Sequence, residues 1–216
     1  MIDLHTHTIA SDGELVPAEL VRRAECKGYR FIAITDHADS SNLEAIVTAA
    51  VKAAEEARRS GRIVVIPGVE LTHSAPALIP ELIREARWMG ARLVVVHGET
   101  IVEPVAAGTT SAAVKGEADI ISHPGLISPG VAKRAARKGV HLEISLRKGH
   151  SLANGHVAKT ARECGAPLVI GTDAHSPGDL VTREEAHTAA RGAGLTPTEI
   201  RRAFINAERL ALKVSA

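Results

Sequence analysis

Aromatic side chains and cysteines are both rare in this sequence. Tryptophan, tyrosine and phenylalanine together make up 2% of the 216 residues, whereas 45% of the residues are hydrophobic. The core must therefore consist of valine, isoleucine, leucine and alanine, which is typical of parallel sheets covered by helices. The two cysteines, Cys26 and Cys164, lie far apart in helix-like segments. This spacing favours reduced, packed thiols in a cytoplasmic protein over a disulfide.

The sequence also lacks an excess of charge and a long apolar segment. Lysine and arginine number 26 against 25 acidic residues, which gives a net charge of +1. We therefore expect neither a nucleic-acid partner nor a membrane partner, since both usually require a basic surface. No apolar run is long enough to span a bilayer, and an acid with two histidines interrupts the N-terminus too early for a signal peptide. One cytoplasmic domain over residues 1–216 is predicted, and its oligomeric state is not indicated.

Short β-rich runs alternate with helix-like segments along the whole chain. The runs are 2–5, 31–35, 63–69, 92–96, 119–122, 140–145 and 168–172. Proline in a first turn or glycine after a last turn marks most of the predicted helices, which are 17–27, 42–60, 79–89, 129–138, 156–164, 183–191 and 197–212. Pro67 and Gly68 are expected to break the third run, 147–155 is expected to be a loop, and 98–116 is the least regular segment. This alternation predicts βαβ units and a parallel sheet.

Almost every β run ends in a side chain that can bind a metal ion. In chain order these are His5, His7, Asp36, His37, Glu70, His97, His123, Asp173 and His175. A single histidine at a strand end is more often structural, but six such strand ends out of seven are hard to obtain by accident. The carboxyl ends of barrel strands meet in a ring, whereas an open sheet would spread them along a row. The sequence therefore predicts an α/β fold, a distorted TIM-like (β/α)7 barrel with a metal site at its mouth.

The types of ligand indicate the kind of metal. Imidazoles mixed with carboxylates, without cysteine, suit Zn²⁺, Mn²⁺ or Fe²⁺ and do not suit a site for Mg²⁺ alone. There are more candidate ligands than one ion can bind, so two or three divalent ions are expected to share a carboxylate. Glu70 and Asp173 are the natural shared ligands.

Seven short motifs, taken in chain order, resemble those of the PHP (polymerase and histidinol phosphatase) family of metal-dependent phosphoesterases. They are His5-Thr6-His7, Ser11-Asp12-Gly13, Thr35-Asp36-His37, Gly68-Val69-Glu70, His97-Gly98, Ser122-His123-Pro124 and Gly171-Thr172-Asp173-Ala174-His175. The resemblance implies a trinuclear site at the C-terminal face of the barrel. It assigns His5, His7, Glu70 and Asp173 to one ion, Glu70, His97 and His123 to a second, and Asp12, His37 and His175 to a third. Asp12 departs from relatives with histidine at this position and predicts a more oxygen-rich third site.

The resemblance also implies a function, the hydrolysis of a small phosphate monoester by a metal-activated hydroxide. L-histidinol phosphate is the best-known small substrate of the family. His175 or His37 is expected to protonate the leaving oxygen. Arg147, Lys148, His73 and His150 are predicted to contact the substrate, with a solvated basic turn as the alternative for the first two. Glu99 and Glu103 would either meet an amino group of the substrate or start a helix, and Asp36 is expected to orient an imidazole.

Three other functions compete with this interpretation. The same ions would support a phosphodiesterase or a nucleotide-cleaving enzyme. An amidohydrolase would usually place a lysine at a middle strand end, where this chain has none. A non-catalytic barrel, such as the ribonuclease P protein subunit of this fold, should have lost ligands and gained basic charge, whereas this chain keeps the full set at a net charge of +1.

Overall fold

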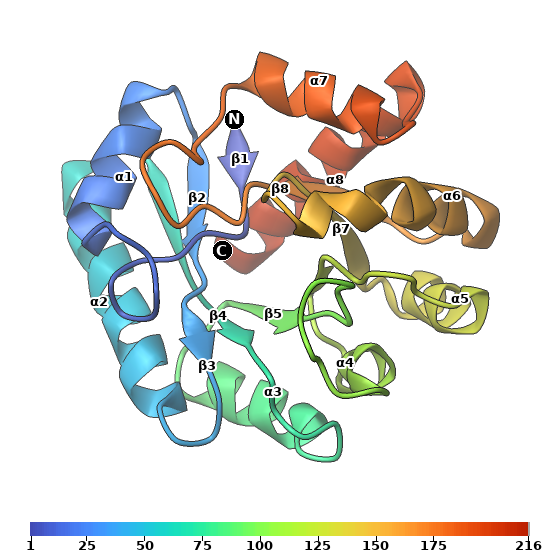
Figure 1. The fold of residues 1–216 in the computed structure, drawn as a ribbon. Helices are drawn as coiled ribbons and strands as arrows, with labels where there is room; N and C mark the ends of the chain where they lie inside the picture. The colour runs from blue at the N-terminus through green and yellow to red at the C-terminus, as the bar shows by residue number, and fades with distance from the viewer. Residues whose placement is uncertain (216) are drawn as a thin grey trace.

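Seven parallel strands form the wall of a barrel, and their order in space follows the sequence. The computed structural model describes residues 1–215 and, at Ser60, the backbone alone. Within these residues each wall strand pairs with the next one along the chain (Figure 1). The wall strands are β1 (Ile2–Asp3), β2 (Phe31–Ile34), β4 (Val64–Leu71), β5 (Leu93–His97), β6 (Ile120–Ser122), β7 (His141–Ser145) and β8 (Leu168–Gly171). A further short strand, β3 (His37–Ala38), pairs with β4.

Backbone contacts between the segments that follow β1 and β8 close the barrel at its carboxyl end. Thr6 forms a parallel bridge with Ala174. The amide of Asp173 donates to the carbonyl of His5 over 2.9 Å, and the amide of His7 donates to the carbonyl of Ala174 over 2.8 Å. The predicted distorted (β/α)7 barrel is confirmed, and its first and last strands meet at the rim that carries the histidines.

Helices surround the wall on its outside (Figure 1), except that the last one fills one end of the barrel. In the described part of the chain they are α1 (Pro17–Cys26), α2 (Leu43–Ser60), α3 (Ile79–Trp88), α4 (Thr109–Gly116), α5 (Pro129–Lys138), α6 (Asn154–Cys164), α7 (Arg183–Gly192) and α8 (Pro197–Ser215). One turn of 3-10 helix, η1 (His150–Ala153), precedes α6. Among residues 1–215 no helix combines the length and the apolar character needed to cross a membrane.

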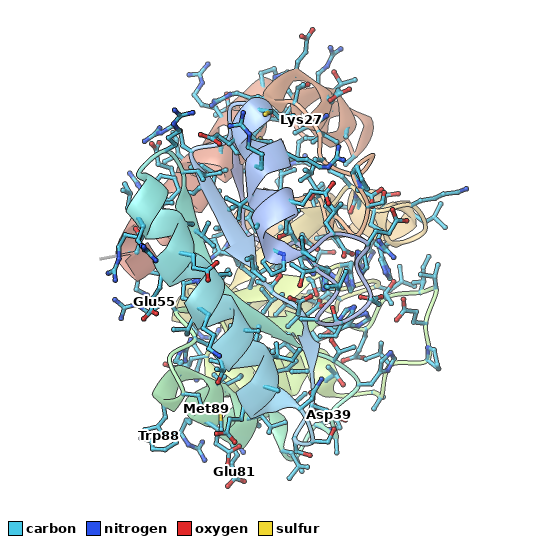
Figure 2. The ribbon with its side chains drawn as sticks, turned by 90° about the vertical axis from the view of Figure 1, so that its left-hand side faces the viewer. Lys27, Asp39, Glu55, Glu81, Trp88 and Met89 are labelled. Carbon is cyan, nitrogen blue, oxygen red and sulfur yellow. The ribbon has the colours of Figure 1, made fainter. Side chains whose placement is uncertain are left out.

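Proline and glycine set the helix ends as their backbone preferences predict. Pro17 and Pro129 lie in the first turns of α1 and α5, where a missing N–H is tolerated. Gly61 and Gly139 end α2 and α5 in the left-handed conformation, with φ of 72° and 70°. The single tryptophan, Trp88, lies at the surface at the end of α3 and is 86% exposed (Figure 2). The core therefore depends on aliphatic side chains, as the composition predicts.

The alternation of side chains along each strand separates two apolar layers. In β5, Leu93 and Val95 belong to a cluster inside the barrel, whereas Val94 and Val96 pack in the layer beneath the helices. His97 is the next residue on the inner side of the same strand. The interior of the barrel therefore changes from apolar to polar where the strands end.

The last helix fills the opposite end of the barrel. Its buried face joins the inward side chains of the strands in one cluster of Ile2, Leu4, Phe31, Ala33, Ile66, Leu93, Val95, Ile120, Val169, Ala207, Leu210, Ala211 and Val214. In Figure 1, α8 passes behind β1 and β8, and it contacts both of these strands and β4. Water is thereby excluded from the floor of the barrel, beneath the polar rim.

The predicted break at Pro67 and Gly68 is wrong, because β4 continues through both residues. Val64–Pro67 pairs with β2, whereas Gly68–Leu71 pairs with β5. The Pro–Gly step is thus the place where β4 changes its pairing partner. A Cβ atom on Gly68 would lie 2.8 Å from Thr35 Cγ2 and 2.9 Å from the carbonyl oxygen of Leu93, so only glycine fits there.

Two further local predictions need correction. The expected loop over residues 147–155 contains η1 and the start of α6, where His150 is buried and its Nδ1 lies 2.8 Å from the hydroxyl of Thr100. The strand β3 follows directly on β2 in the sequence and was not predicted, since two residues carry no periodic pattern.

Replacing Leu210 with alanine should lower the free energy of unfolding by about 2–5 kcal/mol, because the substitution leaves a cavity in the floor of the barrel. Leu210 is 4% exposed, whereas Leu212 in the same helix is 53% exposed. The control Leu212→Ala should change the free energy by no more than about 0.5 kcal/mol. Urea denaturation followed by circular dichroism measures both, and equal effects would contradict the role given to α8.

Candidate metal centre

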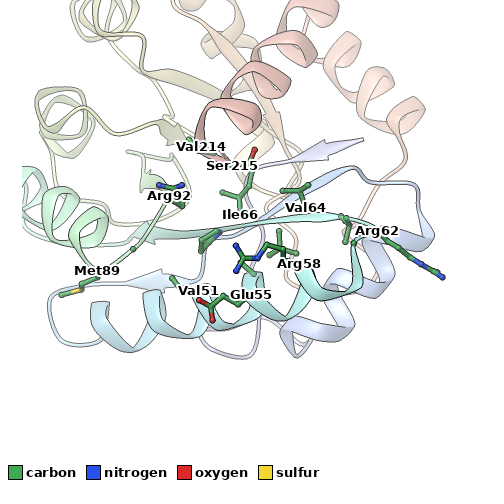
Figure 3. A pocket seen from close by; sticks show the side chains of 16 residues that line it. Val51, Glu55, Arg58, Arg62, Val64, Ile66, Met89, Arg92, Val214 and Ser215 are labelled. Carbon is green, nitrogen blue, oxygen red and sulfur yellow. The ribbon is translucent and has the colours of Figure 1, made fainter.

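A polar cavity of about 240 Å³ opens at the carboxyl ends of the strands. It is lined by Asp12, His37, Thr72, His73, His97, Glu103, His123, Arg147, His150, Asp173 and His175. A larger hollow of about 540 Å³ lies beside the amino-terminal half of β4, between α2 and the end of α8 (Figure 3). The described residues that line this larger hollow include no histidine, so the chemistry belongs to the smaller cavity.

The deepest group of ligands is formed by His5, His7, Glu70 and Asp173. The Nε2 atoms of His5 and His7 lie 3.0 Å apart. Nε2 of His5 lies 3.3 Å from Oε1 of Glu70, and Nε2 of His7 lies 3.3 Å from Oδ1 of Asp173. All four side chains are at most 2% exposed. Two ligands of one ion with bonds of about 2.1 Å lie about 3.4 Å apart in tetrahedral geometry. The spacing of these donor atoms therefore suits a shared ion.

A second group lies next to the first, around His97 and His123. Nε2 of His123 lies 3.7 Å from Oε1 of Glu70 and 3.5 Å from Oδ2 of Asp173. The rings of His97 and His123 are 4.4 Å apart. Donor atoms of His97, His123 and His150 converge within the reach of one ion. His150, which was predicted only as a substrate contact, is thus placed where it could also serve as a ligand.

A third group occupies the solvent-facing side of the cavity. Oδ1 of Asp12 lies 3.1 Å from Nε2 of His175 and 3.5 Å from Nε2 of His37. The side chain of Asp12 is 55% exposed, which makes this group the most open of the three. The positive rings of His175 and His37 outweigh burial and lower the pKa of Asp12 to about 2. Asp12 is therefore a carboxylate throughout the neutral range, as an ion ligand must be.

Glu143 holds two of the histidine residues in place through hydrogen bonds. Its Oε1 accepts a hydrogen bond from Nδ1 of His5 over 2.8 Å, and its Oε2 accepts one from the backbone amide of His123 over 3.0 Å. A carboxylate on the far nitrogen sets the tautomer of a histidine and turns its other nitrogen toward an ion. A Cβ atom on Gly171 would lie 2.1 Å from Oε1 of Glu143, so the glycine leaves room for this contact.

Asp36 supports the backbone of the site. The expectation that it orients an imidazole is wrong, because its carboxylate accepts from the amide of Thr8 at 2.6 Å and from the hydroxyl of Ser11 at 2.7 Å. These bonds hold the loop that carries His7 and Asp12. Short polar side chains within this loop make the contact available, and a strand-end position alone gave no sign of it.

The backbone is strained at three residues of the cavity wall. His73, His123 and Asp173 have φ of 52°, 25° and 54°, and Glu117 is the fourth non-glycine residue of the described chain with a positive φ. Such conformations cost about 1–3 kcal/mol each and persist where surrounding contacts enforce them. Their concentration here indicates that the fold aims these side chains into the cavity.

The buried charges of the ion-free cluster perturb one another. Burial disfavours the charged ring of His5, but the carboxylates of Glu143, Glu70 and Asp173 outweigh it and raise the pKa of His5 well above its usual value. Burial opposes ionisation of Glu70, yet His5 and His37 lower its pKa well below the usual range. Burial and the negative charge of Glu70 raise the pKa of Asp173. One proton on His5 thus occupies the place that a cation would take.

The donors present fit divalent transition ions. Imidazole nitrogens and carboxylate oxygens converge without cysteine, which is the donor set of Zn²⁺, Mn²⁺ and Fe²⁺ sites. The Nδ1 atoms of His7 and His123 are buried without a hydrogen-bond partner in the described structure. Neither ring is therefore hydrogen-bonded through both nitrogens, and a role as ligands through Nε2 accounts for their burial.

Three of the four residues predicted to contact the substrate line the cavity. Arg147, His73 and His150 line the cavity, whereas Lys148 is exposed and does not belong to its lining. The guanidinium of Arg147 donates to the carbonyl of Asp173 over 3.3 Å, which holds it beside the ligands. Glu103 also lines the cavity, although the sequence offered only its position after a strand end as a sign.

Residues 3–120, more than half of the sequence, match the PHP domain. The chain belongs to the PHP domain family. An uncharacterized protein from Methanocaldococcus jannaschii is 46% identical over 213 residues, which are 98% of this chain and 98% of the relative. A probable phosphatase from Shewanella halifaxensis is 31% identical, over 86% of this chain and 82% of the relative.

Solved structures resemble this PHP barrel in fold. Histidinol phosphate phosphatase from Lactococcus lactis, complexed with zinc, L-histidinol and phosphate, has a TM-score of 0.61 at 16% identity, over 90% of this chain and 94% of that one. A chain of archaeal ribonuclease P with mature tRNA has a TM-score of 0.68 at 16% identity, over 98% of this chain and 90% of that one. At these identities the likeness concerns the fold alone.

Replacing Glu143 with glutamine should weaken zinc binding about 10- to 100-fold, the loss typical of a residue that orients a ligand. Glutamine offers one acceptor oxygen, so either the ring of His5 or the amide of His123 loses its partner. Competition with a chromophoric chelator measures the affinity. The exposed Glu56→Gln on α2 removes the same charge and should bind zinc like the unaltered protein, and an equal loss in both variants would contradict the assignment.

Zinc binding should release protons and strengthen as the pH rises. The pKa values of His5 and Asp173 are raised in the ion-free protein, and a ligand must lose its proton before it binds an ion. Protons therefore compete with zinc below the raised pKa of His5, which lies above the ordinary histidine value of 6.5. Calorimetry in buffers of different ionisation enthalpy counts the protons. Uptake without proton release, with an affinity independent of pH around neutrality, would refute this coupling.

Proposed function

We propose that this chain is a metal-dependent phosphoesterase that hydrolyses a small phosphate monoester. The observation that carries the proposal is the convergence of all predicted ligands on one rim, in groups that share Glu70 and Asp173. Relatives with the name of probable phosphatase, and the fold of histidinol phosphate phosphatase, support the same class of reaction. L-histidinol phosphate is one candidate within this class.

The cavity and its residues suit a small ester. Two or three divalent ions, when bound, would lower the pKa of a water molecule and offset the negative charge on the phosphoryl oxygens. Arg147 would add a planar fork of N–H donors for phosphate at the edge of the cavity. The volume of about 240 Å³ favours a small molecule over a nucleic-acid strand.

Proton transfer to the leaving oxygen is assigned to the open side of the site when only the two deeper ions are bound, because a ring that holds a third ion has no proton to give. His175 and His37 both face Asp12 there. Nδ1 of His175 donates to the carbonyl of Asp173 over 2.9 Å, which fixes the ring and leaves Nε2 toward the cavity. His37 is 25% exposed, and Glu70 and Asp12 outweigh its burial and raise its pKa. A protonated ring near neutral pH is a suitable general acid.

A panel of substrates tests the proposal directly. The protein loaded with Mn²⁺ or Zn²⁺ should hydrolyse phosphate monoesters, among them L-histidinol phosphate and p-nitrophenyl phosphate, with a higher kcat/KM than bis(p-nitrophenyl) phosphate. Release of inorganic phosphate or nitrophenol measures the rates. A preference for the diester would move the chain to the phosphodiesterase alternative, and the absence of any turnover would favour a non-catalytic barrel.

The variant His7→Ala should abolish tight metal binding and reduce kcat/KM by more than about 100-fold, the upper range for residues that only orient a ligand. Nε2 of His7 lies 3.3 Å from Oδ1 of Asp173, in the deepest ligand group. His187→Ala, in α7 and outside the groups of converging ligands, is the matched control and should keep both properties. Retained turnover in His7→Ala would refute the metal assignment.

A further inference from the structure

The connection between β5 and α4 forms a loop beside the cavity, and hydrogen bonds join the two ends of this loop. Oε1 of Glu99 accepts hydrogen bonds from the amides of Gly108 at 3.2 Å and Thr110 at 2.9 Å, which ties the two ends of the loop together. Glu99 therefore serves the start of α4, and its alternative role as a contact to the substrate is not supported. Ile101 and Val102 at the tip are 50% and 45% exposed. Closed loops of this kind are frequently functional.

Glu103 turns inward from this loop, and three imidazoles face its carboxylate. Oε2 lies 3.2 Å from Nε2 of His97 and 3.4 Å from Nε2 of His73. Oε1 lies 3.4 Å from Nε2 of His150. The three rings come from different elements, so the carboxylate joins β5, the connection after β4 and η1. A solvated surface acid does not gather three ring nitrogens in this way.

The contact between His97 and Glu103 has the geometry of two ligands of one ion. Nδ1 of His97 lies 3.2 Å from the carbonyl oxygen of Gly98, which can only accept, so the proton is on Nδ1. In the neutral ring, Nε2 presents a lone pair to the Glu103 carboxylate, and a proton or a bound ion between the two atoms offsets their repulsion. Their separation of 3.2 Å is the spacing of two ligands of one ion.

We propose that Glu103 is a protein ligand of an ion that His97 also holds, with His73 as the third converging side chain, and that the loop between β5 and α4 supplies it. The assignment rests on the metal centre of the proposed function. It adds a carboxylate to a group otherwise rich in imidazole, and it places that ligand on the exposed part of the chain, where its side chain is 38% exposed. Thr100 supports the same arrangement, because its hydroxyl lies 2.8 Å from Nδ1 of His150 and turns Nε2 of that ring toward Glu103.

Cobalt binding tests this assignment without the use of activity. Co²⁺ absorbs visible light with an intensity that depends on the number of its ligands. Titration of the metal-free full-length protein and of Glu103→Gln with Co²⁺ should show that one ion binds at least about tenfold more weakly in the variant, with an altered spectrum for that ion alone. Glu184→Gln, an exposed acid in the first turn of α7, is the matched control and should match the unaltered protein.

Each outcome is decisive. Equal affinity and an equal spectrum for Glu103→Gln and the unaltered protein would overturn the assignment and leave the proposed function standing. A weaker affinity with an unchanged spectrum would also overturn it, since the carboxylate would then act only by its charge. If the unaltered protein takes up no Co²⁺, Zn²⁺ or Mn²⁺, the metal centre itself fails and the assignment fails with it. Thermal unfolding of the metal-free variants should coincide, because Glu103 lies on an exposed loop.

Discussion

The buried carboxylate of Glu70 is the constraint on which the rest of the site depends. It has no solvent exposure, and ring nitrogens of His5, His7, His37 and His123 lie 2.8–3.7 Å from its oxygens. An unpaired buried charge costs several kcal/mol, so this residue requires positive charge around it. The imidazoles supply part of that charge only when they carry protons. Metal ions would supply it while leaving the rings neutral, which is the form that binds ions.

The barrel reconciles this polar cluster with a stable core by dividing its interior into two layers. α8 and the inward aliphatic side chains fill the lower layer, and the ligands fill the upper one. The change occurs within single strands, as in β5, where Leu93 and Val95 precede His97 on the same side. The apolar floor keeps water away from the cluster and lowers the local dielectric, which strengthens every interaction between ligand and ion. The same floor makes unpaired charges expensive.

The sequence predicted most of the fold because the residues that begin and end each helix or strand lie within or next to that element. Glycine and proline mark the helix ends, and short β-rich runs mark the strands, so the sequence alone places ligands at strand ends. What was missed depends on contacts between distant residues. The continuity of β4 through Pro67 depends on a change of pairing partner. The bond of Glu143 to His5 spans 138 residues. Neither leaves a signal in the segment itself.

The residues of the site also divide by the kind of element that carries them. His5, Glu70, His97 and Asp173 lie at or directly after strand ends, where backbone pairing across the barrel fixes them. Four other cavity residues, Asp12, Glu103, Arg147 and His150, lie in connections between a strand and a helix. A change in the first set would disturb the buried cluster. The second set can vary without that penalty. Differences in substrate among barrels of this kind should therefore arise in the connections that follow β5 and β7.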